Sequence, residues 1–330
     1  MIISRTPFRI SFFGGGTDYP DWYREHGGAV LSTTFDKYSY ISCRELPPFF
    51  DHKHRIAYSK LEYVNEAREI EHPAIRGIFN ELNISKGMEI HCDADLPARS
   101  GLGSSSSFVV GMLQALKAQQ GEYVTKEWLA KEAIRIEQSV LGECVGSQDQ
   151  IAAAYGGFNF IEFERGGTFS VNPLNISLER AGELNDHLLL FFTGFSRIAS
   201  NIAKSKVANF AKRQNELRAI RAQVDEAIDI LCGKKRIEEF GILLNQGWQL
   251  KRNLSDKVSN EQIDKIYEKA KSKGALGGKI LGAGGGGFML IFAFPDDHEK
   301  IKKELNEFIH VPFRFDNTGA DIIYNTNLAI

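Results

Sequence analysis

Apolar and polar side chains alternate in several short segments, and this pattern predicts strands with one buried face. The clearest cases are Ile2–Ile10 and Met88–Asp95. Tyr38–Arg44 and Arg55–Ser59 show a weaker form of the same alternation. Further strands are expected at 156–163, 169–172, 187–192, 288–294, 313–315 and 321–324. Strands therefore recur along the whole chain.

Apolar residues at intervals of three and four predict helices between these strands. One apolar stripe runs from Leu217 through Val224 to Leu231 and predicts a single long helix. Thr125 can act as the N-cap of another helix. The helices expected from this spacing are 74–82, 108–117, 126–141, 217–231, 237–254, 261–272 and 299–309.

Length and composition allow two ordinary domains that share a cleft. The chain has 330 residues, of which 43% are apolar. A polar stretch at Asn175–Asp186 predicts a boundary between domains at 1–180 and 181–330. The 40 Lys and Arg residues nearly balance the 42 Asp and Glu residues, and the net charge is −2. This balance argues against nucleic acid or an anionic membrane as a partner and favours a small molecule.

The sequence contains no segment typical of a membrane span. Its longest apolar runs, 187–195 and 288–294, are far shorter than the roughly 20 residues that a spanning helix needs. The N-terminus lacks a basic segment followed by a long apolar one, so we expect a cytoplasmic protein. The four cysteines are widely spaced and form no CxxC pair, which indicates neither a disulfide framework nor a zinc site.

A cluster of polar residues at 51–55 contains Asp51, His52 and His54 beside Lys53 and Arg55. The spacing could be taken for a set of metal ligands. Nothing nearby completes such a set, and charged clusters are normally on the surface. We therefore expect a solvated polar turn.

The segment Pro97–Ser107 has the composition of an anion-binding loop. It lies between the strand at Met88–Asp95 and the helix at Phe108–Lys117, where free N–H groups and the helix dipole favour an anion. Gly101 and Gly103 allow the backbone to approach a ligand. No lysine follows the glycines, which excludes the GxxxxGK[ST] loop. A plain Gly/Ser turn that caps the helix is the alternative. The candidate nucleotide-binding residues are Pro97, Arg99, Ser100, Gly101, Leu102, Gly103, Ser104, Ser105, Ser106 and Ser107.

A second glycine-rich segment, Ser11–Pro20, follows the first strand. Ordering three consecutive glycines costs about 0.5–1 kcal/mol each relative to alanine, so a ligand is expected to need the bare backbone. Asp18 would bind a polyol, and Arg9 would direct a fixed positive charge at a transferring phosphate. A hairpin turn in which Asp18 bonds its own backbone is the alternative. The candidate substrate-binding residues here are Gly14, Gly15, Gly16, Thr17 and Asp18.

Two carboxylates, Glu137 and Asp149, follow in the middle of the chain. Glu137 lies among the apolar positions of its helix, and a buried carboxylate needs a partner. That partner could be an arginine or a backbone amide, or it could be Mg²⁺, which prefers carboxylate, hydroxyl and phosphate oxygens. Asp149 precedes a helix that begins near Ile151 and could serve only as its N-cap.

The segment Gly282–Gly287 is a formal match to GxGxxG. A dinucleotide-binding loop of that kind must open a helix, but Phe288–Phe294 is apolar and β-prone. We therefore expect these glycines to join two strands.

The spelling Pro-x-x-x-Gly-Leu-Gly-Ser-Ser resembles the phosphate-binding motif of the GHMP kinases, the superfamily of galactokinase, homoserine kinase, mevalonate kinase and phosphomevalonate kinase. The segments near residues 7–19, 97–107 and 279–288 follow the family's order. The resemblance implies an α+β fold of two domains. The N-terminal domain would be like the second domain of ribosomal protein S5 and the C-terminal domain ferredoxin-like. It also implies a kinase that uses ATP and Mg²⁺.

The same resemblance assigns roles to individual residues. Asp149 would be the base or orienter of the acceptor hydroxyl, and Arg9 would stabilise the γ-phosphoryl group. Ser105 and Glu137 would hold Mg²⁺. Galactokinases have Glu and His where this chain has Gly15 and Gly16, which argues against galactose. Further substrate contacts are expected from Arg197, Gly284 and Gly285.

Within the superfamily, Phe12–Pro20 and Phe192–Arg197 are most similar to kinases of D-glycero-D-manno-heptose 7-phosphate. Such kinases form the 1,7-bisphosphate on the route to nucleotide-activated heptose for surface polysaccharide. One alternative is an L-fucose-type kinase of the anomeric hydroxyl. Another is a non-catalytic sugar sensor on the same fold, against which the presence of both Glu137 and Asp149 speaks. The expected partners are ATP and a sugar phosphate, and the sequence allows a homodimer.

Overall fold

The computed structural model describes residues 1–98, 100–194 and 199–326. Within these residues, nine strands form one large sheet in the order β13-β1-β2-β5-β3-β4, while β6 and β12 pair with β2, and β7 pairs with β6. Neighbouring strands run antiparallel, except that β3 and β5 are parallel. The strands are β1 (Ile2–Phe13), β2 (Gly28–Glu45), β3 (His54–Ala57), β4 (Leu61–Val64), β5 (Met88–Ala94), β6 (Asn159–Phe163), β7 (Phe169–Pro173), β12 (Phe315–Asp316) and β13 (Asp321–Asn325).

Strand β2 is much longer than the strand expected at Tyr38–Arg44. Every residue of its first part, Gly28–Phe35, is buried. Helices α5 and α8 both pack against β2, so this part has no solvent-facing side. A strand buried on both faces shows no alternation, which is why the sequence pattern did not reveal it.

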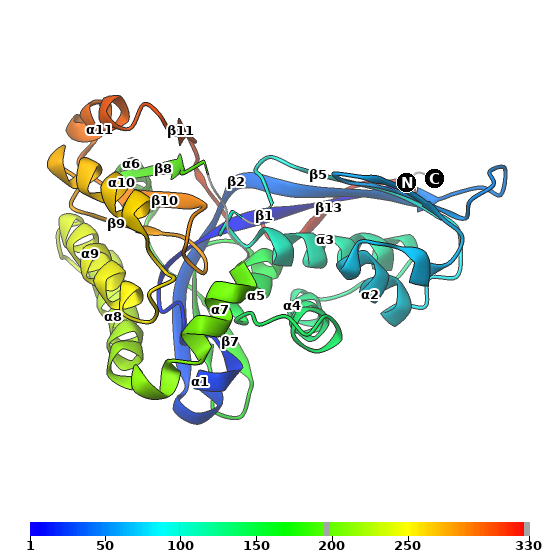
Figure 1. The fold of residues 1–330 in the computed structure, drawn as a ribbon, viewed down its shortest axis with the longest axis horizontal. Coiled ribbons are helices and arrows are strands. Elements are labelled where there is room, and N and C mark those ends of the chain that lie inside the picture. Colours follow the sequence, from blue (N-terminus) through cyan, green and yellow to red (C-terminus); the bar gives the residue numbers. More distant parts are fainter. Residues whose placement is uncertain (99, 195–198, 327–330) are drawn as a thin grey trace.

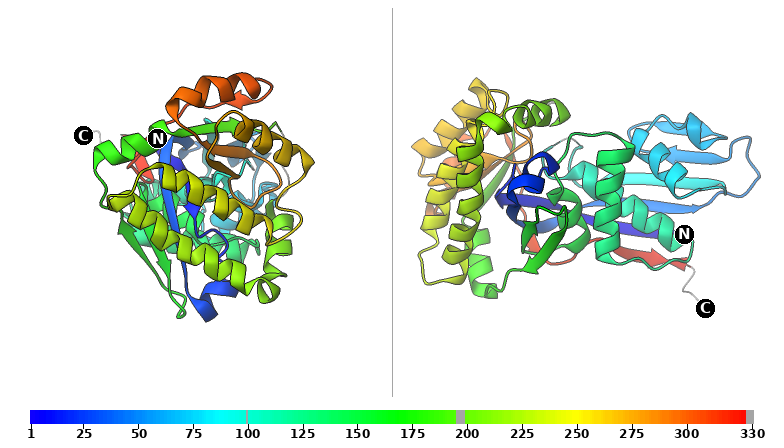
Figure 2. Two further views of the ribbon diagram at one scale, coloured as in Figure 1. Left: turned by 90° about the vertical axis from the view of Figure 1, so that its left-hand side faces the viewer. Right: turned by 90° about the horizontal axis from the view of Figure 1, so that it is seen from below.

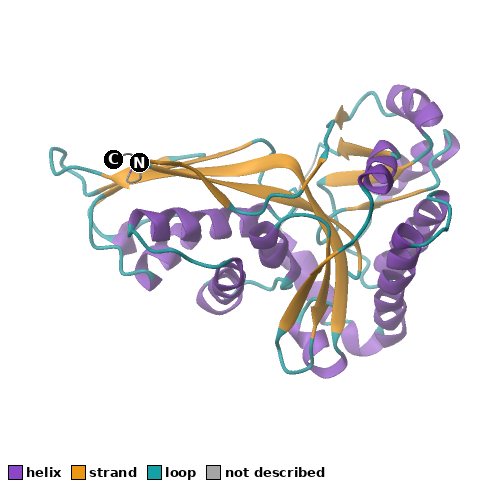
Figure 3. Ribbon diagram, turned by 180° about the vertical axis from the view of Figure 1, so that it is seen from behind, coloured by secondary structure: helices purple, strands orange, loops and turns teal. Residues whose placement is uncertain are grey.

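Helices cover one face of the large sheet, as Figures 1 and 3 show. Ile41 and Ile90 of the sheet share a buried core with Ile78, Val109 and Leu113 of these helices. The helical segments of this half are α1 (Pro20–His26), η1 (Ala67–Glu69), α2 (Pro73–Glu81), α3 (Ser104–Gln119), α4 (Lys126–Arg135), the π-helical turn η2 (Ile136–Val140) and α5 (Gln148–Tyr155).

A second, antiparallel sheet has the strand order β11-β8-β10-β9. The glycines between β9 and β10 join two strands, as expected for Gly282–Gly287. The strands are β8 (Leu188–Phe192), β9 (Gly277–Ile280), β10 (Phe288–Phe292) and β11 (Ile309–His310). The helices are α6 (Leu178–Asp186), α7 (Ala199–Val207), η3 (Phe210–Lys212), α8 (Gln214–Cys232), α9 (Glu238–Arg252), α10 (Glu261–Ser272), η4 (Pro295–Asp297) and α11 (His298–Glu304).

The two sheets share one apolar core. Phe8 and Phe12 of β1 belong to the same cluster as Phe240 of α9 and Leu290 of β10. Figure 2 shows α8 and α9, in green to yellow, lying across the blue strands β1 and β2. The C-terminal end of β1, with the glycine-rich turn that follows it, is therefore enclosed by both halves.

The polar cluster at 51–55 is not a solvated turn throughout, which corrects the expectation. His54 is buried at the start of β3, and its ring lies against Phe79. Burial lowers the pKa of His54, with a further contribution from the Lys53 charge. Strand pairing with β4 and β5 places this residue in the interior.

No helix within the described ranges is long and apolar enough to cross a membrane.

Candidate active site

The predicted phosphate loop ends in the first turn of α3. This helix begins at Ser104, four residues earlier than the expected start at Phe108, so all four serines belong to its first turn. Gly103 precedes the helix in the left-handed region with φ of 77°, and Gly101 has φ of 83°. The start of an α-helix, where the first N–H groups point out of the helix, is a place where an anion can bind.

The loop between β9 and β10 lies directly against the phosphate loop. A Cβ atom on Gly101 would lie 2.6 Å from the Leu281 carbonyl oxygen, and one on Gly287 would lie 2.2 Å from the Ser100 carbonyl oxygen. Only glycine allows this approach. Gly284 and Gly285 instead pack on Val258, to whose carbonyl oxygen the Gly285 N–H donates at 2.8 Å. Their contact with a substrate stays a prediction.

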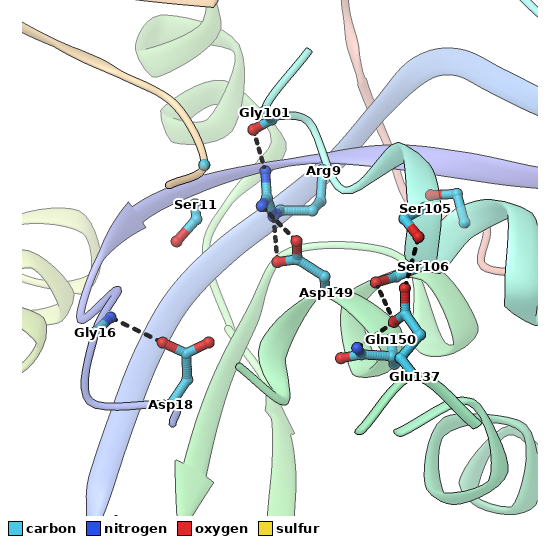
Figure 4. A network of polar contacts seen from close by, with 12 residues as sticks. Arg9, Ser11, Gly16, Asp18, Gly101, Ser105, Ser106, Glu137, Asp149 and Gln150 are labelled. Atoms are coloured by element: carbon cyan, nitrogen blue, oxygen red, sulfur yellow. Dashed lines mark hydrogen bonds and ion pairs between the residues drawn. The ribbon is translucent and has the colours of Figure 1, made fainter. Parts of the chain in front are cut away.

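Arg9 and Asp149 form an ion pair at the centre of the site (Figure 4). Nε and Nη2 of Arg9 each donate to one Asp149 oxygen at 2.7 Å, and Nη1 donates to the Gly101 carbonyl oxygen at 2.8 Å. The Arg9 side chain is 4% exposed and that of Asp149 27%. Arg9 thus connects β1, the phosphate loop and α5, and the Asp149 carboxylate keeps access to a ligand.

Glu137 is fully buried beneath the first turn of α3. Its carboxylate accepts hydrogen bonds from Ser105 Oγ at 2.8 Å, from Ser106 Oγ at 2.7 Å and from the Gln150 amide. Burial raises the pKa of Glu137 to about 7, and the hydrogen bonds from these side chains oppose that shift. The sequence predicted that Ser105 and Glu137 hold one ion, which stays a prediction, and it did not single out Gln150.

This arrangement fits a hard divalent cation. A carboxylate with two hydroxyl groups at the edge of a phosphate loop is the donor set that Mg²⁺ prefers. Gln150 Oε1 is also buried and has no hydrogen-bond partner among the described residues, which leaves an oxygen acceptor available beside Glu137. When bound, the ion would neutralise charge on the phosphates.

The glycine-rich turn after β1 holds Asp18 almost completely buried, at 1% exposure. Asp18 accepts a hydrogen bond from the Gly16 N–H at 2.8 Å, so it does bond its own turn. Burial raises the pKa of Asp18; the Gly16 bond opposes this, and the Asp149 charge adds to it. The Thr17 hydroxyl bonds the carbonyl oxygens of Gly14 and Ala29, which makes Thr17 and Gly14 part of the turn's own structure.

Two polar side chains beside Asp18 were missed by the sequence analysis. Ser11 Oγ and Gln148 Oε1 are buried and have no hydrogen-bond partner among the described residues. A Cβ on Gly15 would lie 3.6 Å from Gln148 Nε2 and 3.7 Å from Ser11 Oγ, so the bare Gly15 backbone faces both. In Figure 4 Ser11 and Asp18 lie beside the Arg9–Asp149 pair. These groups together can bind a molecule with several hydroxyl groups.

Two lysines of the C-terminal half, also missed, lie buried near this site. Lys279 Nζ donates to the carbonyl oxygens of Ser11 at 3.0 Å and of Phe12 at 2.7 Å. Lys251 Nζ donates to those of Ile280 at 2.6 Å and of Gly282 at 2.7 Å. Burial lowers the pKa of both ammonium groups, that of Lys279 to about 7.

Two further candidates from the sequence, Arg99 for the nucleotide and Arg197 for the substrate, lie outside the described residues.

The sequence of this chain matches known protein families and individual relatives. The chain matches the family description "GHMP kinases N terminal domain" over residues 59–157 and "GHMP kinases C terminal" over residues 226–311. It is 33% identical over 324 residues to the D-glycero-alpha-D-manno-heptose 7-phosphate kinase of Campylobacter jejuni subsp. jejuni serotype O:2, with 93% of each chain covered.

Two other relatives support the same grouping. The chain is 28% identical to the bifunctional fucokinase/GDP-fucose pyrophosphorylase of Arabidopsis thaliana, over 98% of this chain and 32% of that protein. The crystal structure of a D-glycero-D-manno-heptose 1-phosphate kinase from Bacteroides thetaiotaomicron has 27% identity and a TM-score of 0.80, with 98% of this chain and 100% of that chain covered. The predicted α+β fold of two domains is confirmed by these matches.

Proposed function

The chain belongs to the GHMP kinase family and is an ATP-dependent sugar kinase, and from this premise we propose that it phosphorylates the anomeric hydroxyl of D-glycero-D-manno-heptose 7-phosphate to give the 1,7-bisphosphate. The observation that carries the proposal is the Arg9–Asp149 pair, which is bonded to the phosphate loop and lies near the polar groups around Asp18. The relative from Campylobacter jejuni, named for the same heptose phosphate, supports this choice of acceptor.

In this proposal the nucleotide's phosphates bind the Gly101–Ser107 loop and the first turn of α3. Ser105 and Glu137, with Ser106, would hold Mg²⁺. Arg9 uses three of its five N–H groups on Asp149 and Gly101, so two remain for the transferring phosphoryl group. Phosphoryl transfer passes through a loose transition state and depends mainly on positioning and charge neutralisation.

The acceptor would lie over Gly15, with its hydroxyls bonded to Asp18, Ser11 and Gln148. Asp149 would accept a hydrogen bond from the anomeric hydroxyl, orient its oxygen toward the γ-phosphorus and take the proton as the new O–P bond forms. The bond between the γ-phosphorus and the oxygen of the departing ADP breaks in the same step. Its two carboxylate oxygens have lone pairs beyond those that Arg9 occupies. In this proposal one ion pair, Arg9–Asp149, positions both the transferring phosphoryl group and the acceptor hydroxyl.

The test is ADP formation by the purified protein with ATP, Mg²⁺ and a panel of sugars and sugar phosphates. We expect the highest kcat/KM with D-glycero-D-manno-heptose 7-phosphate, and a product whose phosphorus NMR spectrum shows a new anomeric phosphate. L-Fucose is on the panel because of the similarity to the Arabidopsis fucokinase. A preference for L-fucose would replace the heptose assignment, and no turnover with any sugar would support a sugar sensor.

A further inference from the structure

Helix α7 carries two lysines with opposite surroundings. Lys204 is exposed, whereas Lys206 is only 4% exposed. The ammonium of Lys206 lies 5.3 Å from the centre of the Tyr19 ring, and Tyr19 follows Asp18 in the glycine-rich turn. Lys206 is therefore not an ordinary solvated charge but is enclosed at the acceptor side of the site.

The other buried cations of this region already have oxygen partners. Arg9 is bonded to Asp149 and Gly101, and Lys251 and Lys279 each donate to two carbonyl oxygens. Among the described residues, Lys206 Nζ makes no hydrogen bond or ion pair with protein; its contact is with the Tyr19 ring. Because the side chain is only 4% exposed and its ammonium has no protein acceptor, a ligand atom is expected to supply one.

The charged side chains around Lys206 also act on its ammonium group. Arg9, Lys206, Lys251 and Lys279 repel one another electrostatically, and Asp18 and Asp149 are the carboxylates that act on Lys206. Burial lowers the pKa of Lys206, and these two carboxylates oppose that shift. An anionic ligand beside the Lys206 ammonium would likewise favour its charged form.

The contacts separate the donor side from the acceptor side. A Cβ on Gly103 of the phosphate loop would lie 3.2 Å from Arg9 Cγ and 3.6 Å from Asp149 Cγ. The ATP phosphates that are proposed to bind this loop would therefore lie next to the Arg9–Asp149 pair. Lys206 contacts Tyr19 instead, at the end of the site where Asp18 is buried. Its ammonium thus lies beside the turn that is proposed to bind the acceptor.

We propose that Lys206 binds an anionic group carried by the acceptor itself, a phosphate monoester on the sugar, and so makes the enzyme selective for a sugar phosphate over the neutral sugar. This inference rests on the proposed function and goes beyond it by assigning the residue that sets the substrate class. Lys206 would donate to the phosphate oxygens, and its position over Tyr19 would fix the direction of the ammonium.

The experiment compares Lys206→Met, which keeps the unbranched side chain up to its terminal ammonium but removes the charge, with Lys204→Met two residues away. Steady-state kinetics are measured with D-glycero-D-manno-heptose 7-phosphate, with the dephosphorylated heptose and with ATP. For Lys206→Met we expect KM for the heptose phosphate to rise about 10- to 100-fold, the usual effect of losing a charge-assisted contact. KM for ATP and kcat/KM for the neutral heptose should change less than about 3-fold, and Lys204→Met should match wild type.

Several outcomes would overturn the inference while leaving the proposed kinase activity intact. One is an equal loss on the phosphorylated and neutral heptoses, which would indicate a merely structural role. Another is a fall in kcat with unchanged KM, which would assign Lys206 to the transferring phosphoryl group. A third is unchanged kinetics of Lys206→Met. If Lys206→Met is not recovered folded by circular dichroism, Lys206→Gln is measured in the same way. Wild-type protein that turns over no heptose phosphate would contradict the proposed function itself.

Discussion

At the scale of single residues, the bidentate contact between Arg9 and Asp149 is the one on which the proposed chemistry depends. Bidentate pairs between arginine and a carboxylate are among the strongest polar contacts in proteins, and they fix orientation as well as distance. Arg9 is almost completely buried, so it holds Asp149 in one place and depends on that carboxylate for its counter-charge. A change in either side chain therefore affects the position and the charge of the other.

Replacing Asp149 by asparagine should lower kcat by at least about 10²-fold, the usual scale for a positioned acid or base. An asparagine amide can accept only one of the two Arg9 bonds and presents N–H groups to the other, so the fork is lost together with the negative charge. KM for ATP should stay near the wild-type value, because in the proposed complex the phosphates bind the Gly101–Ser107 loop and the first turn of α3. Steady-state kinetics check both parameters, and a variant with most of its turnover would remove Asp149 from the proposed role.

Replacing Glu137 by glutamine should raise the Mg²⁺ concentration that gives half-maximal rate, because a carboxamide is a neutral and poorer ligand for a hard cation. Ser105→Ala and Ser106→Ala should shift it in the same direction. Ser107→Ala is the matched control, since Ser107 Oγ in the same turn donates to the Pro7 carbonyl oxygen at 2.8 Å and not to Glu137. If magnesium titrations of the first three variants coincide with that of Ser107→Ala, these residues do not form the metal site.

The sequence identified Arg9, Asp149, Ser105 and Glu137 as candidates, because their motifs carry recognisable spacing. It did not reveal which of them pair. Arg9 and Asp149 are separated by 140 positions, and such a contact leaves no periodic signal in one sequence. Ser11 and Gln148 were missed for a related reason, since a lone polar residue in a strand or a first helical turn looks like an ordinary surface residue until the fold buries it.

At the scale of secondary-structure elements, the helical segment that carries Glu137 could be predicted only in part. The helix expected at Lys126–Leu141 exists, but α4 ends at Arg135 and a π-helical turn continues it through Val140. Glu137 lies in this turn. A π-turn often occurs at a functional site and changes the direction of its side chains, and it leaves the apolar spacing of the helix largely intact. The sequence could therefore predict the helix but not the turn that directs Glu137 toward the serines.

Helix α3 has a left-handed glycine at each end, and these two positions form a matched pair. Gly103 has φ of 77° and Gly121 has φ of 78°. Alanine at either position should cost about 1–2 kcal/mol of stability for the left-handed backbone. A Cβ at 121 meets no atom within 4 Å, whereas one at 103 would lie 3.2 Å from Arg9 Cγ. Arg9 cannot move away easily, because Asp149 and Gly101 both hold it.

We therefore expect Gly103→Ala to lower kcat by about 10- to 100-fold through a displaced ion pair, and Gly121→Ala to leave kcat unchanged. Thermal unfolding of both variants measures the backbone cost that they share, and steady-state kinetics measure the difference between them. Equal activities would mean that the start of α3 does not position Arg9.

At the scale of the whole molecule, the site exists because the two halves are packed into one core around the end of β1. The last strands, β12 and β13, return to the large sheet and pair with β2 and β1. The alternation of apolar residues predicts where these strands lie along the chain but not their partners, since pairing across most of the chain length is a tertiary property. The division at residue 180 stays a prediction. The Lys279 ammonium bonds the β1 backbone and is one polar contact that ties the halves together.

This tie should make the stability of the ligand-free protein depend on pH in a way that Lys279→Met removes. Burial first, and then the charges of Arg9 and Lys206, lower the pKa of Lys279 from 10.5 to about 7. Between these values the unfolded chain holds the proton and the folded protein does not, so the free energy of unfolding rises with pH across this window. Below pH 7 both states are protonated, and the folded protein bears the full cost of the buried charge.

Each pH unit inside the window is worth up to about 1.4 kcal/mol, so wild type should gain about 2 kcal/mol relative to Lys279→Met between pH 7 and pH 9. The other groups titrate in both proteins, so the difference between their urea unfolding free energies at the two pH values reports Lys279 together with its electrostatic effect on Lys251. A difference that stays constant, or that falls as pH rises, would show that Lys279 keeps its charge in the folded protein.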